Sequence, residues 1–230
     1  EPLERGFGTT IGNALRRVML SSLPGSAVTS VKIAGVMHEF QKIDGVKEDV
    51  TTIILNLKRL VLINHSTDTN KVIRLVANEE GPVTAGQIAA DADIEIVNPD
   101  LVICNLCKGG KIDMEMTVGN GRGYVDSKAN EKLLGEKKVG VIAIDSLYSP
   151  IERVSYEVEP ARVGQNENYD KLIMHVYTNG SVTPEEAMAL SAKILVEHFN
   201  IITDLNNIAD VSGLMAEKKV DTITKTLETP

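Results

Sequence analysis

Aromatic side chains are scarce in this sequence of 230 residues, which has no tryptophan, three phenylalanines and five tyrosines. Proteins that bind single-stranded nucleic acid stack the bases on aromatic side chains, and aromatic cages hold organic cations. With so few aromatic residues, the sequence has little material for a base-stacking site or an aromatic cage, and it disfavours both functions. The scarcity also predicts a core made mostly of aliphatic side chains.

Positive charge is in deficit as well. The sequence carries 24 Lys and Arg against 32 Asp and Glu, which gives a formal net charge of −8 at pH 7. A protein whose main task is to neutralise phosphates on nucleic acid or on anionic lipid has the opposite balance. A local basic patch on an acidic chain remains compatible with this composition.

Cysteines and long apolar runs are few. Two cysteines in a chain of this length do not make a secreted disulfide scaffold and suit a reducing compartment, so we expect a cytoplasmic protein. The longest apolar stretches, such as residues 60–63, are far shorter than the ~20 residues that span a membrane, and no signal peptide is apparent. We therefore expect no membrane partner.

Motifs for metal binding or catalysis are also lacking. Cys104 and Cys107 have the C-x-x-C spacing of redox and zinc sites, but no second pair of cysteines or histidines completes a zinc set. We interpret them as two buried structural cysteines. No phosphate-binding loop, nucleophile elbow or H-E-x-x-H pattern occurs. The sequence therefore predicts no metal, no cofactor and no catalytic residue on this chain.

Two groups of glycines invite a nucleotide-binding interpretation. Gly6, Gly8 and Gly12 precede or open a predicted helix, but Ile11 occupies the position where the dinucleotide fingerprint requires its third glycine. A nucleotide-binding enzyme is thus an alternative that the spacing disfavours. The second group, at residues 119–123, follows a strand and predicts a tight turn.

The first predicted helix ends at Pro24 and Gly25 and has two different faces. One face is an apolar stripe made of Ile11, Ala14, Leu15, Val18 and Met19. The other carries Arg16, Arg17 and Leu20. Because arginine is the charged residue favoured at interfaces, this second face either is solvated or docks on another protein.

The middle of the chain has the pattern of β-strands. Alternation over residues 112–118 predicts a half-buried strand, and residues 60–63 and 72–76 predict the two strands of a hairpin. Asp49 is predicted to cap a short helix. The charged residues 126–138 lack periodicity and predict a loop.

Two strands and a helix are predicted in the last third of the chain. The strands cover residues 151–159 and 171–178, and Thr183 and Glu186 form a capping box at the start of the helix. Apolar residues over positions 187–202 cover an arc of roughly 200°, wider than the ~100° that one core-facing side needs. This helix is either the central helix of the core of a monomer or one that also packs on another subunit, and we favour the second interpretation.

Several short blocks of the sequence, taken in order, carry a resemblance to one known family. They are LERGFG (3–8), GNALRR (12–17), SS (21–22), GRGYV (121–125), YSPIERV (148–154), ARVGQ (161–165), YDKL (169–172), TNG (178–180) and PEEA (184–187). In this order they resemble the N-terminal region of the alpha subunit of bacterial DNA-directed RNA polymerase. The resemblance extends over residues 1 to about 205, which is nearly the whole chain.

The resemblance implies an α+β fold in two parts. Residues 1–24 and 150–205 would form a dimerisation domain of helices on a small antiparallel sheet, and residues 25–149 a β-rich domain inserted into it. Residues 206–230 would be a linker toward a C-terminal DNA-binding domain that these residues do not include. The implied function is that of a non-catalytic subunit, which dimerises and scaffolds the assembly of beta and beta-prime for DNA-templated transcription. The nucleotidyltransferase activity would belong to the whole complex.

The resemblance also implies roles for single residues. The expected contacts to the second alpha subunit are Phe7, Leu15, Leu195 and Phe199. The expected contacts to beta or beta-prime are Arg16, Arg17, Leu20, Lys58 and Lys171. Transcription regulators are further expected partners, and DNA would be contacted only through the C-terminal domain.

The sequence leaves the pairing of the alpha subunits open. Asn166 to Asn168, Asn120 and Arg59 depart from the residues usual in the family. These departures permit a divergent alpha paralogue that forms a heterodimer with a different alpha chain.

Overall fold

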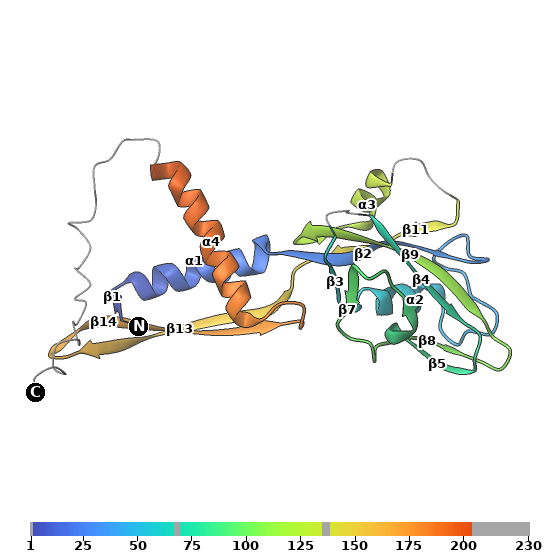
Figure 1. Ribbon diagram of the computed structural model, residues 1–230, viewed down its shortest axis with the longest axis horizontal. Coiled ribbons are helices and arrows are strands. Elements are labelled where there is room, and N and C mark those ends of the chain that lie inside the picture. Colours follow the sequence, from blue (N-terminus) through green and yellow to red (C-terminus); the bar gives the residue numbers. More distant parts are fainter. Residues whose placement is uncertain (1, 67–69, 135–138, 204–230) are drawn as a thin grey trace, which may run out of the picture.

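The computed structural model describes residues 2–66, 70–134 and 139–203. Helices and antiparallel strands form an α+β fold that is drawn out along one axis (Figure 1). One end holds two long helices and a β-hairpin, and the other holds a larger sheet with shorter helices. The predicted linker at residues 206–230 lies outside the described residues.

One end of the molecule is built on a three-stranded sheet. β14 (Asn166–Thr178) lies between β1 (Leu3–Glu4) and β13 (Ile151–Val163), and both pairings are antiparallel. The two strands predicted after Pro150 are confirmed and are longer than expected. Their ladder continues up to the turn at Gly164, whose φ of +63° favours glycine.

α1 (Phe7–Ser22) lies along β13 and packs against α4 (Pro184–Thr203), as Figure 1 shows. The buried apolar cluster at this end consists of Leu15, Met19, Leu23, Ile151, Val154 and Ala187. The predicted apolar stripe of α1 is therefore confirmed at Leu15 and Met19. Leu20, which was expected on the opposite face, instead packs partly buried against this cluster, since it follows Met19 by only about 100° around the helix.

The larger sheet forms the other end of the molecule. Its strand order is β6-β4-β9-β2-β3-β7, and β11 also pairs with β2. The bounds are β2 (Pro24–Ile33), β3 (Leu62–Asn64), β4 (Lys71–Ala77), β6 (Ile88–Ala89), β7 (Ile94–Ile96), β9 (Ile112–Arg122) and β11 (Val141–Ala143). Two smaller antiparallel pairs are β5 (Gly81–Thr84) with β8 (Val102–Leu106), and β10 (Tyr124–Val125) with β12 (Ser146–Leu147).

The core of this end is aliphatic, as the scarcity of aromatic residues predicts. Val31, Ile73, Leu75, Met114 and Met116 are fully buried between the sheet and α2 (Val50–Leu57). The predicted alternation over residues 112–118 is confirmed, because every second side chain enters this core. The predicted cap of α2 is confirmed as well: the Asp49 carboxylate accepts a hydrogen bond from the Thr52 amide at 2.9 Å.

Two predictions for the middle of the chain are wrong. Residues 60–63 and 72–76 do not form a hairpin, because β3 pairs with β2 and β7 whereas β4 pairs with β9 and β6. Residues 126–138 are not entirely a loop, because α3 (Ser127–Leu133) begins there. Its N-cap is the Asp126 carboxylate, which accepts a hydrogen bond from the Ala129 amide at 2.8 Å.

Two further corrections concern glycine and cysteine. Gly119 and Gly121 continue β9 instead of making a tight turn, and the chain bends at Gly123, where φ is +64°. Cys104 is buried in β8, and burial raises the pKa of its thiol to about 12. Cys107 follows the end of β8 and is exposed, so only one of the two cysteines is a core residue.

The chain passes between the two apolar clusters at residues 23–25 and 148–151, and the two passages touch. The Tyr148 amide donates to the Gly123 carbonyl at 2.8 Å. The carbonyl of Tyr148 lies directly over the space that a side chain at Gly25 would occupy. The Tyr148 ring lies over Gly121, where an added Cβ would be 2.7 Å from the ring. Glycine at position 25 therefore lets the two backbones approach, and glycine at position 121 leaves room for the Tyr148 ring.

Candidate functional site

The N-terminus of α1 is held by a side chain from the hairpin. One carboxylate oxygen of Asp170, Oδ2, accepts hydrogen bonds from the amides of Gly6 at 2.8 Å and Gly8 at 3.2 Å. Gly6, the N-cap residue of α1, has φ +91° and no side chain that could cap the helix. Asp170 thus supplies the cap from β14, at the position where that strand pairs with Leu3 of β1.

The glycines of α1 serve close packing. A Cβ at Gly8 would lie 2.8 Å from Val158 Cγ1, and a Cβ at Gly12 would lie 2.7 Å from the Tyr156 ring. Both distances are shorter than side-chain contacts allow, so glycine lets α1 approach the hairpin. This packing accounts for the glycine spacing that suggested a nucleotide-binding enzyme.

Asp170→Ala is expected to lower the free energy of unfolding by about 1 kcal/mol, the usual contribution of an N-cap side chain. For a chain of this size that corresponds to a melting temperature lower by about 2–4 °C. Thermal unfolding followed by circular dichroism measures it. Asp100→Ala, at an exposed position away from α1, is the matched control and should stay within about 0.5 kcal/mol of the parent. Equal melting of both variants would show that Asp170 does not cap α1.

The three side chains expected to contact a large subunit from α1 lie in different surroundings. Arg16 is partly buried, and its Nε donates to the Val154 carbonyl of β13 at 3.2 Å. Leu20 packs against the core, as described above. Arg17 is exposed. Arg17 also borders a shallow hollow of about 560 Å³ together with Leu195 of α4, so the structure brings two residues with different predicted roles to one surface.

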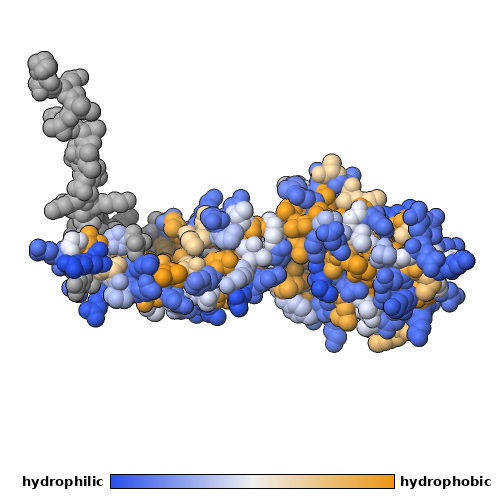
Figure 2. Space-filling view, turned by 90° about the horizontal axis from the view of Figure 1, so that it is seen from below, coloured by the Kyte–Doolittle hydropathy of each residue, from blue (hydrophilic) through white to orange (hydrophobic). Residues whose placement is uncertain are grey.

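The four residues expected at the dimer interface are also placed differently. Phe7 is 51% exposed and Phe199 is 58% exposed, whereas Leu195 is partly buried beside α1. Leu15 is 7% exposed and belongs to the core of its own chain. It therefore supports this surface from beneath. Figure 2 shows apolar side chains reaching the surface at this end of the molecule.

α4 carries an uncovered apolar face. The predicted capping box is confirmed: the Glu186 amide donates to Thr183 Oγ1 at 3.3 Å, and the Thr183 amide donates to the Glu186 carboxylate at 3.0 Å. The hydrogen bonds that the Thr183 amide and hydroxyl donate to the Glu186 carboxylate lower the pKa of Glu186. Buried positions of α4 include only Ala187 and Ser191. The exposed apolar side chains of its second half are Val196, Phe199, Ile201 and Ile202.

Lys58 lies at a meeting point of three elements. Its ammonium is 2.6 Å from Asp145 Oδ2, and Asp145 Oδ1 accepts a hydrogen bond from the Ser127 amide at the start of α3, at 2.8 Å. The hydrogen bonds from Lys58 and Ser127 lower the pKa of Asp145. Tyr124 stands beside this carboxylate, and its pKa is raised by desolvation and by the charge of Asp145.

Sequence reasoning missed the neighbours of Lys58. Tyr124 and Leu147 are cross-strand partners in the β10–β12 pair, and they are 63% and 61% exposed. Asp145 lies two residues before Leu147. No local pattern in the sequence indicates that these residues, separated by more than sixty positions from Lys58, come together.

Lys171 is less constrained. Its ammonium is 3.2 Å from the carboxylate of Glu159, its cross-strand partner, and both side chains are about half exposed. An ion pair this open contributes little to folding stability. Lys171 is therefore available to a partner at small cost.

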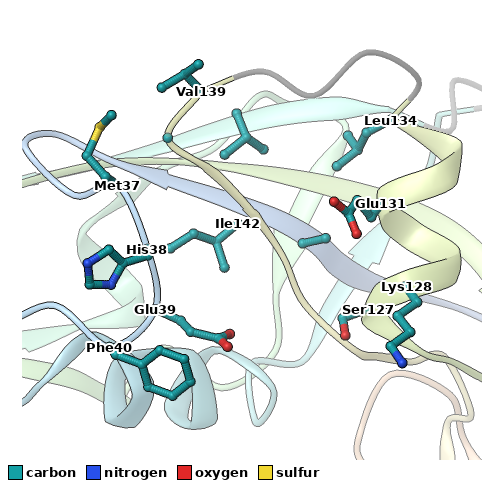
Figure 3. Close-up of a pocket in the computed structure, with 13 residues that line it drawn as sticks. Met37, His38, Glu39, Phe40, Ser127, Lys128, Glu131, Leu134, Val139 and Ile142 are labelled. Carbon is teal, nitrogen blue, oxygen red and sulfur yellow. The ribbon is translucent and has the colours of Figure 1, made fainter.

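A hollow of about 550 Å³ lies between the loop at residues 37–40 and α3 (Figure 3). Met37 and Phe40 are exposed on one side, Leu134 stands on the other, and Ile142 lies between them. Glu131 adds a carboxylate from α3. The hollow lies within the region predicted as the inserted β-rich domain.

Within residues 2–66, 70–134 and 139–203, no three His, Cys, Asp or Glu side chains form a group that could hold a metal ion. No helix in the described part of the chain has both the length and the hydropathy to cross a membrane.

Comparisons with known proteins agree on one family. Residues 31–149 match the family described as the RNA polymerase Rpb3/RpoA insert domain. The chain is 56% identical over 228 residues to the DNA-directed RNA polymerase subunit alpha of Desulforamulus reducens, covering 99% of this chain and 71% of that protein. The subunit alpha of Carboxydothermus hydrogenoformans is 51% identical over 230 residues, covering 100% of this chain and 72% of that protein.

The subunit alpha of Symbiobacterium thermophilum is 55% identical over 228 residues, again covering 99% of this chain and 71% of the relative. The resemblance seen in the sequence is thereby confirmed. Matched along its whole length by these relatives, and carrying the insert between α1 and the hairpin on which α1 packs, the chain belongs to the family of DNA-directed RNA polymerase alpha subunits.

Proposed function

We propose that this alpha subunit dimerises through α1 and α4 and then scaffolds the beta and beta-prime subunits of the polymerase. The observation that carries the proposal is the apolar face of α4, where Phe199, Ile201 and Ile202 are exposed. Isolated exposed apolar residues are ordinary, but several on one helix mark a protein interface. Phe7, at the start of α1, and Leu195 extend this surface.

The proposed division into domains follows the two apolar clusters. Residues 1–24 and 150–205 contain one cluster, and residues 25–149 contain the other. The first unit would be the dimerisation domain and the second the inserted β-rich domain. Such an arrangement lets one unit form the dimer while the other reaches outward to partners.

Contacts to the large subunits are proposed at Arg17, Lys58 and Lys171, whose cationic groups are at the surface. Arg16 and Leu20 would act by fixing α1 on the hairpin and the core, as their contacts indicate. The chain would contribute no catalytic residue and no cofactor to nucleotidyl transfer. The complex would act in the cytoplasm. Regulators would meet the inserted domain, and DNA would be contacted through a C-terminal domain.

Arg17→Ala is expected to weaken capture of beta by roughly tenfold while the alpha dimer persists, since arginine is enriched among the interface residues whose truncation costs more than about 1 kcal/mol. Coexpression of the full alpha chain with tagged beta, followed by quantitative pull-down, measures capture. Sedimentation velocity at micromolar concentration measures the dimer. Unchanged capture by the variant would remove Arg17 from the proposed contact.

The partner of the dimer can be determined in the same preparation. Mass measurement of dimers from two differently tagged alpha chains separates a homodimer from a heterodimer with a paralogue. A parent chain that stays monomeric at every concentration would contradict the scaffold proposal.

A further inference from the structure

Tyr148 lies between the two ends of the molecule. Its side chain is only 6% exposed, yet it is a member of neither apolar cluster. Among the three phenylalanines and five tyrosines, all of which the structure describes, it is the only buried residue, and the others are partly or mostly exposed. A sequence poor in aromatic residues therefore buries a ring at the place where the chain passes from one cluster to the other.

A pair of glycines forms the seat of Tyr148. Gly25 of β2 and Gly121 of β9 are cross-strand partners. Residues that lie opposite each other in an antiparallel ladder project to the same face, so the two missing side chains leave one continuous space. The Tyr148 carbonyl covers Gly25, and its ring covers Gly121, where ring atoms lie 2.7–2.9 Å from an added Cβ. Tyr148 therefore spans the glycine pair at the edge of the larger sheet.

The backbone around Tyr148 is bonded to both ends. Its amide donates to the Gly123 carbonyl at 2.8 Å, one residue after β9. The Pro150 carbonyl accepts a hydrogen bond from the Asn179 amide at 3.0 Å, one residue after β14. Residues 148–150 are therefore bonded to the larger sheet on one side and to the β13–β14 hairpin on the other.

A second contact between the ends involves different residues. Gly180, in the turn between β14 and α4, has φ +94°, and an added Cβ there would lie 3.1 Å from Val97 Cγ1. Val97 directly follows β7 of the larger sheet. Two chain passages alone can act as a hinge, because a few terminal residues of each element absorb the change in backbone angles. A further support from other residues resists bending about that hinge.

We propose that Tyr148, seated on Gly25 and Gly121, sets the angle between the two ends of the molecule, with Val97 against Gly180 as a second support. Tyr148 is then a positioning residue, because it acts through the orientation of the ends. Units of one chain usually move relative to each other unless a packed interface holds them. The inference goes beyond the proposed function, since it concerns a single chain and applies whether or not that chain binds a large subunit.

The physical consequence is a fixed spacing along the long axis of the molecule (Figure 1). A partner that touched both ends of a bending chain would have to stop the bending when it binds, and such ordering costs binding free energy. A chain whose angle is already set by Tyr148 avoids that cost. The burial of the ring is therefore expected to affect geometry as well as stability.

The test measures the distance between two spin labels in one copy of the full alpha chain. The first label is attached to Cys107, which is exposed and follows β8 in the larger end. Cys104 does not compete for the label, because it is buried and its thiol has a pKa of about 12. The second label is attached to Ser155→Cys, at an exposed position of β13 in the other end.

The labelled chain has no other reactive thiol and is mixed with an excess of unlabelled chain carrying Cys107→Ser. A dimer then holds at most one labelled copy, and the distance is measured within a single chain. Pulsed electron double resonance gives the distribution of distances. The parent is expected to give one narrow distribution, and a broad one would overturn the proposal.

Tyr148→Ala should broaden the distribution about twofold or more, because the ring between the two ends is lost and the hinge can bend. Tyr148→Phe keeps the ring and should match the parent. Gly121→Ala pushes the ring off its seat, so it should shift or broaden the distribution and decides the question if Tyr148→Ala does not fold. A parent-like distribution in either alanine variant would overturn the proposal. Val97→Ala should broaden the distribution less, and no change would remove Val97 as a support.

Leu75→Ala separates orientation from stability. Leu75 is fully buried in the core of the larger sheet, so its truncation leaves a cavity away from Tyr148. We expect a lower melting temperature and the distance distribution of the parent. Melting temperatures of all the variants are measured in parallel. If Leu75→Ala broadens the distribution as much as Tyr148→Ala does, Tyr148 acts only through stability and the positioning role is wrong.

Discussion

Gly25→Ala is expected to lower the free energy of unfolding by about 3 kcal/mol, because an added Cβ would collide with the backbone carbonyl of Tyr148. A side chain could rotate away from such a collision, but a carbonyl in a paired backbone cannot. Relief requires the two passages between the apolar clusters to separate. The Tyr148 amide would then lose its hydrogen bond to Gly123.

The measurement is thermal unfolding, where a change of that size corresponds to a melting temperature lower by roughly 6–12 °C. Gly164→Ala is the matched control. Gly164 has φ +63° and nothing within 4 Å of an added Cβ, so only backbone strain of about 1 kcal/mol is expected. If both variants melt alike, the close approach at Gly25 is not a determinant of stability.

Phe199→Asp is expected to weaken dimerisation at least 100-fold. In a two-fold symmetric dimer the same side chain is lost twice, and each buried phenylalanine contributes roughly 1.5–3 kcal/mol, so that two copies contribute about 3 kcal/mol or more. The introduced carboxylate adds a desolvation cost. Because Phe199 is 58% exposed in the single chain, folding of the monomer should change little.

Sedimentation equilibrium between nanomolar and micromolar concentration measures the dimer dissociation constant. The control is Glu80→Lys, which makes a charge change at an exposed position outside α1 and α4. It should leave the dissociation constant within a few-fold of the parent. A Phe199→Asp chain that remains fully dimeric at nanomolar concentration would place the interface elsewhere.

Local signals in the sequence predicted the elements that local chemistry determines. Thr183 and Glu186 are three residues apart and make their capping bonds whatever the rest of the chain does. The alternation over residues 112–118 likewise fixes which side chains of β9 enter the core. In these places the burial and hydrogen bonding that stabilise the element involve residues of a single helical turn or a single strand.

The features that escaped prediction depend on register between distant segments. The Asp170 carboxylate caps α1 across 164 residues of sequence, and Asp145 binds Lys58 across 87. β3 and β4 do not pair with each other, because β3 pairs over three residues with β7 and β4 pairs over seven residues with β9. α3 was missed because its stabilising contacts, an Asp126 cap and a buried Asn130 bonded to Ser146, are polar and leave no apolar period.

The arrangement of α1 also has a consequence for synthesis on the ribosome. Arg16 and its partner carbonyl on Val154 are separated by 138 residues. At a synthesis rate of roughly 5–20 residues per second, α1 waits about 7–28 seconds before the strand that covers it emerges. During that interval the apolar stripe containing Leu15 and Met19 lacks β13, the strand on which it packs in the folded protein. The larger sheet, whose strands lie between α1 and β13 in the sequence, can already fold. Nascent chains therefore expose the apolar residues of the α1 segment, and transiently exposed apolar surface is what chaperones bind.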